Sequence, residues 1–255
     1  MHEKKTSNIV NVIIAVILSA GILETLYLLF LIPEGIFYSG DGGLKALLTH
    51  QFSSGNFNAN LVLSHDSWIN ALWNKGYFPF HEPYTYQIGH KFYMHYPIWF
   101  SLITAPFYHV FGYYGLYVVP LVSVWILWIC FALLCKRYKL TTSAVCLALS
   151  ALIFGSPFTL YGLQYWEHAP AIALAFMGFS GILLHFEERP APRRIFLSGI
   201  FLGLSGLLRP ELFCFCAVVL FVCLFVYCAP SSLDQKLEYV GCADCLVSSV
   251  FRCFK

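Results

Sequence analysis

Residues 117–139 read YVVPLVSVWILWICFALLCKRYK and decide the fold class. Residues 117–135 contain no charged side chain, and their number is close to the roughly 20 residues that cross a hydrocarbon layer about 30 Å thick. Lys136, Arg137 and Lys139 follow at once, and clustered basic residues mark the cytoplasmic end of a membrane helix. This stretch therefore predicts a transmembrane helix over 117–135 that ends in the cytoplasm.

The composition of the whole chain agrees with membrane insertion. Hydrophobic residues make up 59% of the 255 residues and charged residues 11%, against roughly 25% charged residues in an average soluble domain. The formal net charge is only +2, and no basic run is interleaved with exposed aromatic residues, so no nucleic-acid partner is expected. The expected fold class is an all-α integral membrane protein.

Further apolar runs extend the membrane domain over residues 1–230, with about six transmembrane helices in total. The additional runs lie at 8–32, 141–162, 169–186, 195–208 and 212–228. The first run is too long for a signal peptide and lacks its cleavage site, so we interpret it as a retained helix. Lys4 and Lys5 place the N-terminus in the cytoplasm, and the arginines at 189, 193 and 194 fall on the same side.

Residues 33–96 are the most polar part of the chain and predict a large structured external loop after the first helix. The loop is rich in Gly, Asn, His, Tyr and Pro, with short amphipathic pieces at 44–52 and 68–73 that favour a position on the membrane surface. Residues 97–111 are apolar but short and contain Pro106, which predicts an interfacial or re-entrant helix.

The last segment, residues 231–255, differs in character from the rest. It is mixed, short and Cys-rich, without a complete span. We interpret it as an atypical tail, either a cytoplasmic extension or the product of a frameshift or premature end. Cys242 and Cys245 form a lone CxxC there, without the second pair of ligands that a zinc site needs.

Three ionisable residues stand out by position. Asp41 lies in SGDGG (39–43), just beyond the outer end of the first helix, where a carboxylate can act as a general base or cap a turn or helix. Arg209 separates two apolar runs; it is either a functional cation or a connecting residue that pairs with Glu211 or snorkels to the interface. Glu24, inside the first helix, is expected to be protonated or paired with a neighbouring helix.

Histidines crowd the external segments, but their spacing follows no metal-site pattern. Neutral imidazole can bind Zn or Mn, yet surface histidines are the better interpretation, and no metal site is predicted. The histidines in question are His50, His65, His81, His90, His95 and His168.

Four features in chain order resemble the GT-C class of membrane glycosyltransferases, which includes the protein O-mannosyltransferases and the lipid A aminoarabinose transferase. The first is an Asp early in the external loop after the first helix, here Asp41. The others are HYPIWF (95–100) followed by APFY (105–108) and FG (111–112), then YWEHAP (165–170), and finally GL at 203–204 with LRPE at 208–211. The resemblance covers residues 10–211 and implies a partial GT-C fold.

The resemblance also implies a function. Such an enzyme transfers a hexosyl or pentosyl group from a polyprenyl-phosphate donor to an acceptor at the extracytoplasmic face, with inversion of the anomeric centre. The expected location is a bacterial inner membrane. The expected partners are membrane lipid and the lipid-linked sugar, which serves as co-substrate, and no metal is assigned. The implied roles are Asp41 as catalytic base; Glu82, Glu167 and His168 as second acid or metal-linked group; Arg209 and Lys45 as donor-phosphate ligands; and Trp68, Trp73 and Tyr86 as sugar or acceptor platform.

Two alternatives remain open from the sequence. A multi-pass transporter or flippase would need a path lined by intramembrane polar groups, for which Glu24 and Arg209 are the ionisable candidates. The other alternative is a truncated, inactive GT-C homologue, because members of that class are generally longer; the chain would then be an N-terminal fragment with an incomplete donor pocket. For Glu34, Asp66, Glu82 and Glu167, a solvated loop carboxylate is an equally good interpretation.

Overall fold

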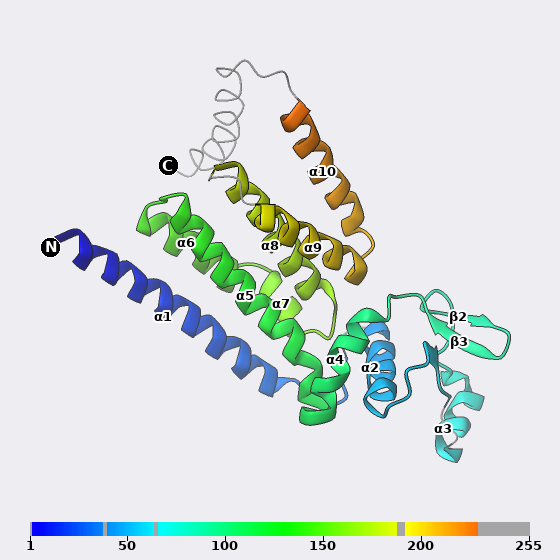
Figure 1. The fold of residues 1–255 in the computed structure, drawn as a ribbon. Coiled ribbons are helices and arrows are strands. Elements are labelled where there is room, and N and C mark those ends of the chain that lie inside the picture. The colour runs from blue at the N-terminus through cyan, green and yellow to red at the C-terminus, as the bar shows by residue number, and fades with distance from the viewer. Residues whose placement is uncertain (1, 38–39, 64–65, 188–191, 229–255) are drawn as a thin grey trace. The chain divides into compact units, whose positions relative to one another are not determined.

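The computed structural model describes residues 2–37, 40–63, 66–187 and 192–228 (Figure 1). The structure is mostly helical, at 74%. It divides into two compact units, residues 1–212 and 213–255. The tail at 231–255, with Cys242 and Cys245, lies outside the described residues.

The apolar runs form helices close to the expected ranges. The helices are α1 (His2–Leu31), α2 (Gly40–Ser53), α3 (Ser67–Leu72), α4 (Trp99–Phe111), α5 (Gly115–Arg137), α6 (Thr142–Phe154), α7 (Phe158–Gly162), α8 (His168–Glu187), α9 (Pro192–Leu208) and α10 (Leu212–Cys228). A π-helical turn, Trp73–Tyr77, follows α3, and a 3₁₀ turn, Gly112–Tyr114, joins α4 to α5.

Two helical stretches in the described part of the chain are long and apolar enough to cross a membrane. They are Val10–Leu31 and Trp99–Arg137. The second comprises α4, the 3₁₀ turn and α5, and its backbone turns at Gly112, where φ is 59°. Shorter apolar helices cover Thr142–Phe154, His168–Leu184 and Leu212–Phe225.

Where the sequence predicts one helix over 141–162, the structure has two, because Pro157 disfavours helix at the residue before it. The Ser156 hydroxyl donates to the Leu152 carbonyl at 2.7 Å and accepts from the Phe158 amide at 3.3 Å. The Thr159 hydroxyl donates to the Ile153 carbonyl at 2.5 Å. Side chains thus satisfy the carbonyls that the broken helix leaves open.

The bundle core forms where α1, α5, α6 and α8 meet around Trp128, which is fully buried (Figure 1). Trp125 Nε1 donates to Thr25 Oγ1 at 3.1 Å and links α5 to α1. At one end of the bundle, Lys136 Nζ donates to Asn11 Oδ1 at 2.7 Å, which brings the basic end of α5 to the start of α1. The bundle thus has a basic end, to which the N-terminal half of α1 belongs.

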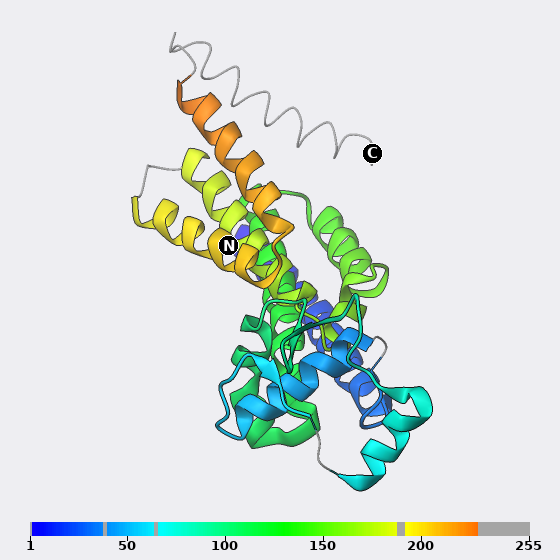
Figure 2. The same cartoon turned by 90° about the vertical axis from the view of Figure 1, so that its right-hand side faces the viewer.

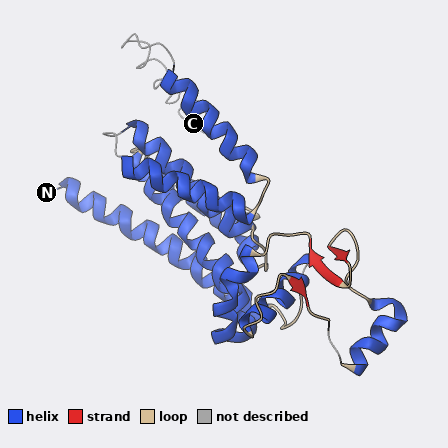
Figure 3. Ribbon diagram, turned by 45° about the vertical axis from the view of Figure 1, so that its right-hand side comes forward, coloured by secondary structure: helices blue, strands red, loops and turns tan. Residues whose placement is uncertain are grey.

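The segment between α1 and α4 lies at the opposite end of the bundle, where α1 ends (Figures 1 and 2). It contains α2, α3 and an antiparallel three-stranded sheet that the sequence did not predict (Figure 3). The strands are β1 (Asn60–Leu61), β2 (Thr85–Ile88) and β3 (Lys91–Met94), in the order β1-β3-β2. Leu61 and Gln87 both pair with Phe92, and Gly89 provides the positive φ (62°) of the two-residue turn between β2 and β3. Apolar side chains of α2 and α4 form a core beneath the sheet.

The contact between α8 and α9 depends on a glycine. A Cβ atom at Gly178 would lie 2.7 Å from Leu202 Cγ and 2.8 Å from the Ser198 carbonyl oxygen. The backbone oxygen cannot move aside cheaply, so the helices pack at a distance that only glycine permits at this position. Gly199, on α9 of the same hairpin, has no atom within 4 Å of such a Cβ.

We therefore expect Gly178→Ala to destabilise the protein by about 1–3 kcal/mol through overpacking. Gly199→Ala is the matched control and should be neutral or stabilising by up to about 1 kcal/mol, since Ala favours helix over Gly. Thermal unfolding of both variants in detergent checks this. Equal melting temperatures for the two variants would contradict the tight α8–α9 contact.

Candidate functional site

The centre of the candidate site is Lys45 on α2, whose side chain is only 1% exposed. Its Nζ lies 3.0 Å from Asp41 Oδ2, one helical turn earlier, and 2.6 Å from Glu167 Oε2. Glu167 comes from the connection between α7 and α8, 122 residues away in sequence. A buried ammonium needs such partners, because desolvation without compensation is very costly. We call Asp41, Lys45 and Glu167 the ion cluster.

Hydroxyl groups hold the backbone of Lys45 in place. Its carbonyl oxygen accepts from Thr49 Oγ1 at 2.8 Å and from Ser101 Oγ, on α4, at 3.1 Å. Tyr165 Oη lies 2.5 Å from Thr49 Oγ1. Because the single hydroxyl proton of Thr49 goes to a carbonyl, Tyr165 is the donor in this pair. The network ties α2 to α4 and to the segment that carries Glu167.

An aromatic ring completes the surroundings of the ammonium. Lys45 Nζ lies 4.1 Å from the centroid of the Tyr96 ring, a cation–π contact. Burial, and after it the carboxylates of Asp41 and Glu167, raise the pKa of Tyr96. Asp41 is the more open of the two acids, with 14% of its side chain exposed against 6% for Glu167. A ligand arriving from outside therefore meets Asp41 first.

His168 lies beside the ion cluster at the start of α8. Its ring sits 4.9 Å from that of Trp166 and 5.2 Å from that of Tyr161, and in the described part of the chain its buried Nδ1 has no hydrogen-bond partner. Burial lowers the pKa of His168, the charge of Arg209 lowers it further, and Glu167 opposes both. The imidazole is therefore neutral at neutral pH.

Arg209 is joined to Glu211 by two hydrogen bonds, from Nε at 3.3 Å and from Nη2 at 2.9 Å. This is the pairing with Glu211 that the sequence left open. The Arg209 side chain is 24% exposed and that of Glu211 69%. The positive charge of Arg209 acts to lower the pKa of both His168 and Tyr96, so the guanidinium contributes to the electrostatic potential around the ion cluster.

The structure thus brings together Asp41, Lys45, Glu167, His168 and Arg209, and it leaves other predicted residues apart. Glu82 is exposed in the turn before β2, and Trp68 on α3 is 65% exposed. Trp73 packs against Phe78 and Phe80 in an aromatic cluster under the sheet. Tyr86 is connected to Tyr96 through the ring of His95. The ring centroids of Tyr86 and His95 are 5.7 Å apart, and those of His95 and Tyr96 are also 5.7 Å apart.

Sequence reasoning missed Tyr96, Tyr165, Thr49 and Ser101. Two signals could have found part of this network. Asp41 and Lys45 have the i, i+4 spacing of a helical ion pair, and Tyr165 stands two residues before Glu167. Within the described ranges, no three His, Cys, Asp or Glu side chains gather as metal ligands would.

The chain matches no protein-family model, no curated protein and no solved structure, so these comparisons assign no family. The chemical interpretation of the site therefore rests on its geometry and on the motifs of the sequence.

The buried ion pair gives a stability prediction. Lys45→Met leaves two carboxylates without their cation, and we expect a loss of about 3–5 kcal/mol. Glu167→Gln in the same background should recover part of it, with a coupling of about 1–3 kcal/mol in a double-mutant cycle measured by denaturant unfolding. The exposed pair Arg209 and Glu211 is the control, with coupling below about 1 kcal/mol. Additive effects of Lys45→Met and Glu167→Gln would contradict the geometry.

The buried hydroxyl of Tyr165 gives a pH prediction. Burial raises its pKa from 10.0 to about 12, so the folded state keeps the phenol neutral where the unfolded state ionises. This contribution to stability is present below pH 10 and is lost as the pH rises from 10 towards 12. Tyr165→Phe should cost about 1 kcal/mol at pH 7 and flatten the decline of stability above pH 10. Parallel declines of wild type and variant would contradict the prediction.

Proposed function

We propose that this chain is a GT-C-type glycosyltransferase, a multi-pass integral membrane protein that moves a sugar from a polyprenyl-phosphate donor to an acceptor at the extracytoplasmic face. The observation that carries the proposal is the ion cluster. It places a partly open carboxylate, Asp41, at the end of the bundle where α1 ends, with Arg209 close enough to act electrostatically on the neighbouring His168.

The distribution of basic residues supports the orientation. Lys136 contacts Asn11 at the basic end of the bundle, and Arg193 and Arg194 begin α9 at the end of the α8–α9 hairpin away from His168 and Arg209. By the positive-inside rule this end faces the cytoplasm. The ion cluster then faces the outside, where a lipid-borne donor meets a water-soluble acceptor.

In the proposed reaction, Asp41 accepts the proton of the acceptor hydroxyl. The acceptor oxygen forms a bond to the anomeric carbon, and the bond between that carbon and the phosphate oxygen breaks. The lipid phosphate leaves with the electron pair, and the single displacement inverts the anomeric centre. Lys45 and Glu167 orient Asp41, since the Lys45 ammonium bridges the two carboxylates.

This division of roles modifies one expectation. Lys45 already binds two carboxylates and the Tyr96 ring, so it is better placed to position Asp41 than to bind the donor phosphate. Arg209 keeps the phosphate role, because its partly exposed guanidinium can form two parallel hydrogen bonds to phosphate oxygens. Glu211 would have to release it as the donor binds.

An apolar groove next to the site supports a lipid-linked donor. The groove has a volume of about 210 Å³ and runs between α4, α5, α8 and α9. Two of its lining residues are close in sequence to the site: Pro170 lies two residues after His168, and Leu208 directly precedes Arg209. Its other lining residues are apolar except Ser123. An isoprenoid tail in this groove would hold its phosphate near Arg209.

Asp41→Asn tests the mechanism, because it keeps the shape of the side chain and removes the base. We expect product formation to fall by about 10²–10⁴-fold in liposomes that contain polyprenyl-phosphate sugars, with melting temperature as a check on folding. Asp66→Asn is the matched control, an exposed aspartate of the same external segment, and should keep full activity. NMR of the product should show the inverted anomer.

Full transfer by Asp41→Asn, or a retained anomeric configuration, would refute this mechanism. Movement of labelled lipid-linked sugar across the liposome membrane without covalent transfer would instead support the transporter alternative. One observation favours that alternative: in the described part of the chain, Glu24 Oε2 on α1 is buried without a hydrogen-bond partner.

A further inference from the structure

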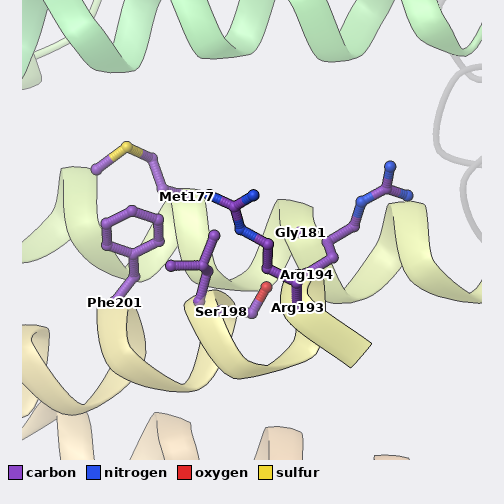
Figure 4. A pocket seen from close by; sticks show the side chains of 7 residues that line it. Met177, Gly181, Arg193, Arg194, Ser198 and Phe201 are labelled. Atoms are coloured by element: carbon purple, nitrogen blue, oxygen red, sulfur yellow. The ribbon is translucent and has the colours of Figure 1, made fainter. Parts of the chain in front are cut away.

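A second groove lies on the α8–α9 hairpin, in the half of the hairpin away from His168 and Arg209 (Figure 4). It has a volume of about 370 Å³, within the range of small-ligand sites. Figure 4 shows the side chains of Arg193 and Arg194 extending from the start of α9 over α8, with Met177 and Phe201 farther along the groove. Gly181, Leu197 and Ser198 complete the lining.

The groove is amphipathic. Arg193 and Arg194 bring positive charge from the start of α9, and in Figure 4 their guanidinium groups point to opposite sides, one of them towards Met177; Leu197 and Phe201 supply apolar surface. Position 181 is glycine because α8 and α9 lie close together there; a Cβ atom would collide with the Ser198 hydroxyl. A ligand that fits must have an anionic group and an apolar part.

The two arginines suit a phosphate. Arginine forms paired hydrogen bonds with phosphate oxygens, and two adjacent arginines provide two such donors. Arg194 Nη1 also donates to the Leu184 carbonyl at 3.0 Å, which orients its guanidinium at the end of α8. The connection between the helices contains Glu187 and Glu188 against three arginines, at 189, 193 and 194, so its charge stays positive.

The position of the groove in the membrane decides the source of the phosphate. The start of α9 belongs to the basic end of the bundle, which the proposed orientation places at the cytoplasmic leaflet, where anionic lipids concentrate. The outer side of α9 is apolar, with Phe196 68% and Leu197 40% exposed. The groove therefore opens towards acyl chains.

We propose that this groove binds an anionic phospholipid of the cytoplasmic leaflet, with the phosphate on Arg193 and Arg194 and one acyl chain along Met177, Leu197 and Phe201. The inference rests on the membrane orientation of the proposed function but not on glycosyl transfer. A lipid-binding experiment without any sugar donor therefore tests it.

The test uses the full chain, purified in neutral detergent and titrated with phosphatidylglycerol or phosphatidylcholine under native mass spectrometry. We expect phosphatidylglycerol to bind the wild type, and the double variant Arg193→Gln/Arg194→Gln to bind it about tenfold more weakly. Lys136→Gln, which removes a cation from the same end outside the groove, is the matched control and should bind as the wild type does. Phosphatidylcholine should bind weakly to all three.

A second measurement needs no variant. Phosphatidylglycerol with a photoreactive group in its acyl chain should label the peptides that contain Leu197 and Phe201, which line this groove and not the one beside the ion cluster. Labelling confined to other peptides, equal binding of the two lipids, or equal affinity of the double variant and the wild type would overturn the proposal. Displacement of the lipid by millimolar inorganic phosphate would also overturn it, since the groove would then be a simple anion site.

Discussion

The packing of α2 against the helical bundle depends on one interaction, the pairing of the buried Lys45 ammonium with two carboxylates. The ammonium pairs with both Asp41 and Glu167, which come from segments far apart in the sequence. The hydroxyls of Thr49, Ser101 and Tyr165 then fix the same point of the backbone. Charge pairing and hydrogen bonding together hold α2 in a defined position against α4 and the segment that precedes α8.

The sequence predicted most of the helices, but only part of the ion cluster and its surroundings. Long apolar runs predict the helices directly, and α5 and α8 begin and end within about two residues of the expected positions. The break at Pro157 and the sheet of β1 to β3 depend on local side-chain bonds and on short strands, which carry weak periodic signals. Asp41, Lys45, Glu167, His168 and Arg209 were each selected from sequence, but their meeting was visible only in three dimensions.

The aromatic residues show the limit of reasoning by residue type. Trp68, Trp73 and Tyr86 were selected because they lie in the external loop and have the ring faces that sugars favour. The ring that contacts the Lys45 ammonium is instead that of Tyr96, the Tyr165 hydroxyl bonds Thr49 on the same helix as Lys45, and Trp166 lies beside His168. Trp73 packs in a core under the sheet, where its ring serves the fold.

The long sequence separation between Lys45 and Glu167 has a consequence for biosynthesis. While the chain is being made, Lys45 is synthesised 122 residues before its second carboxylate partner. Until Glu167 has been made, Lys45 has one acidic partner in the ion cluster instead of two, and the burial that the finished site imposes on it would be costly. The ion cluster must therefore form late in synthesis, and a chain stalled before residue 167 would keep Lys45 hydrated and accessible.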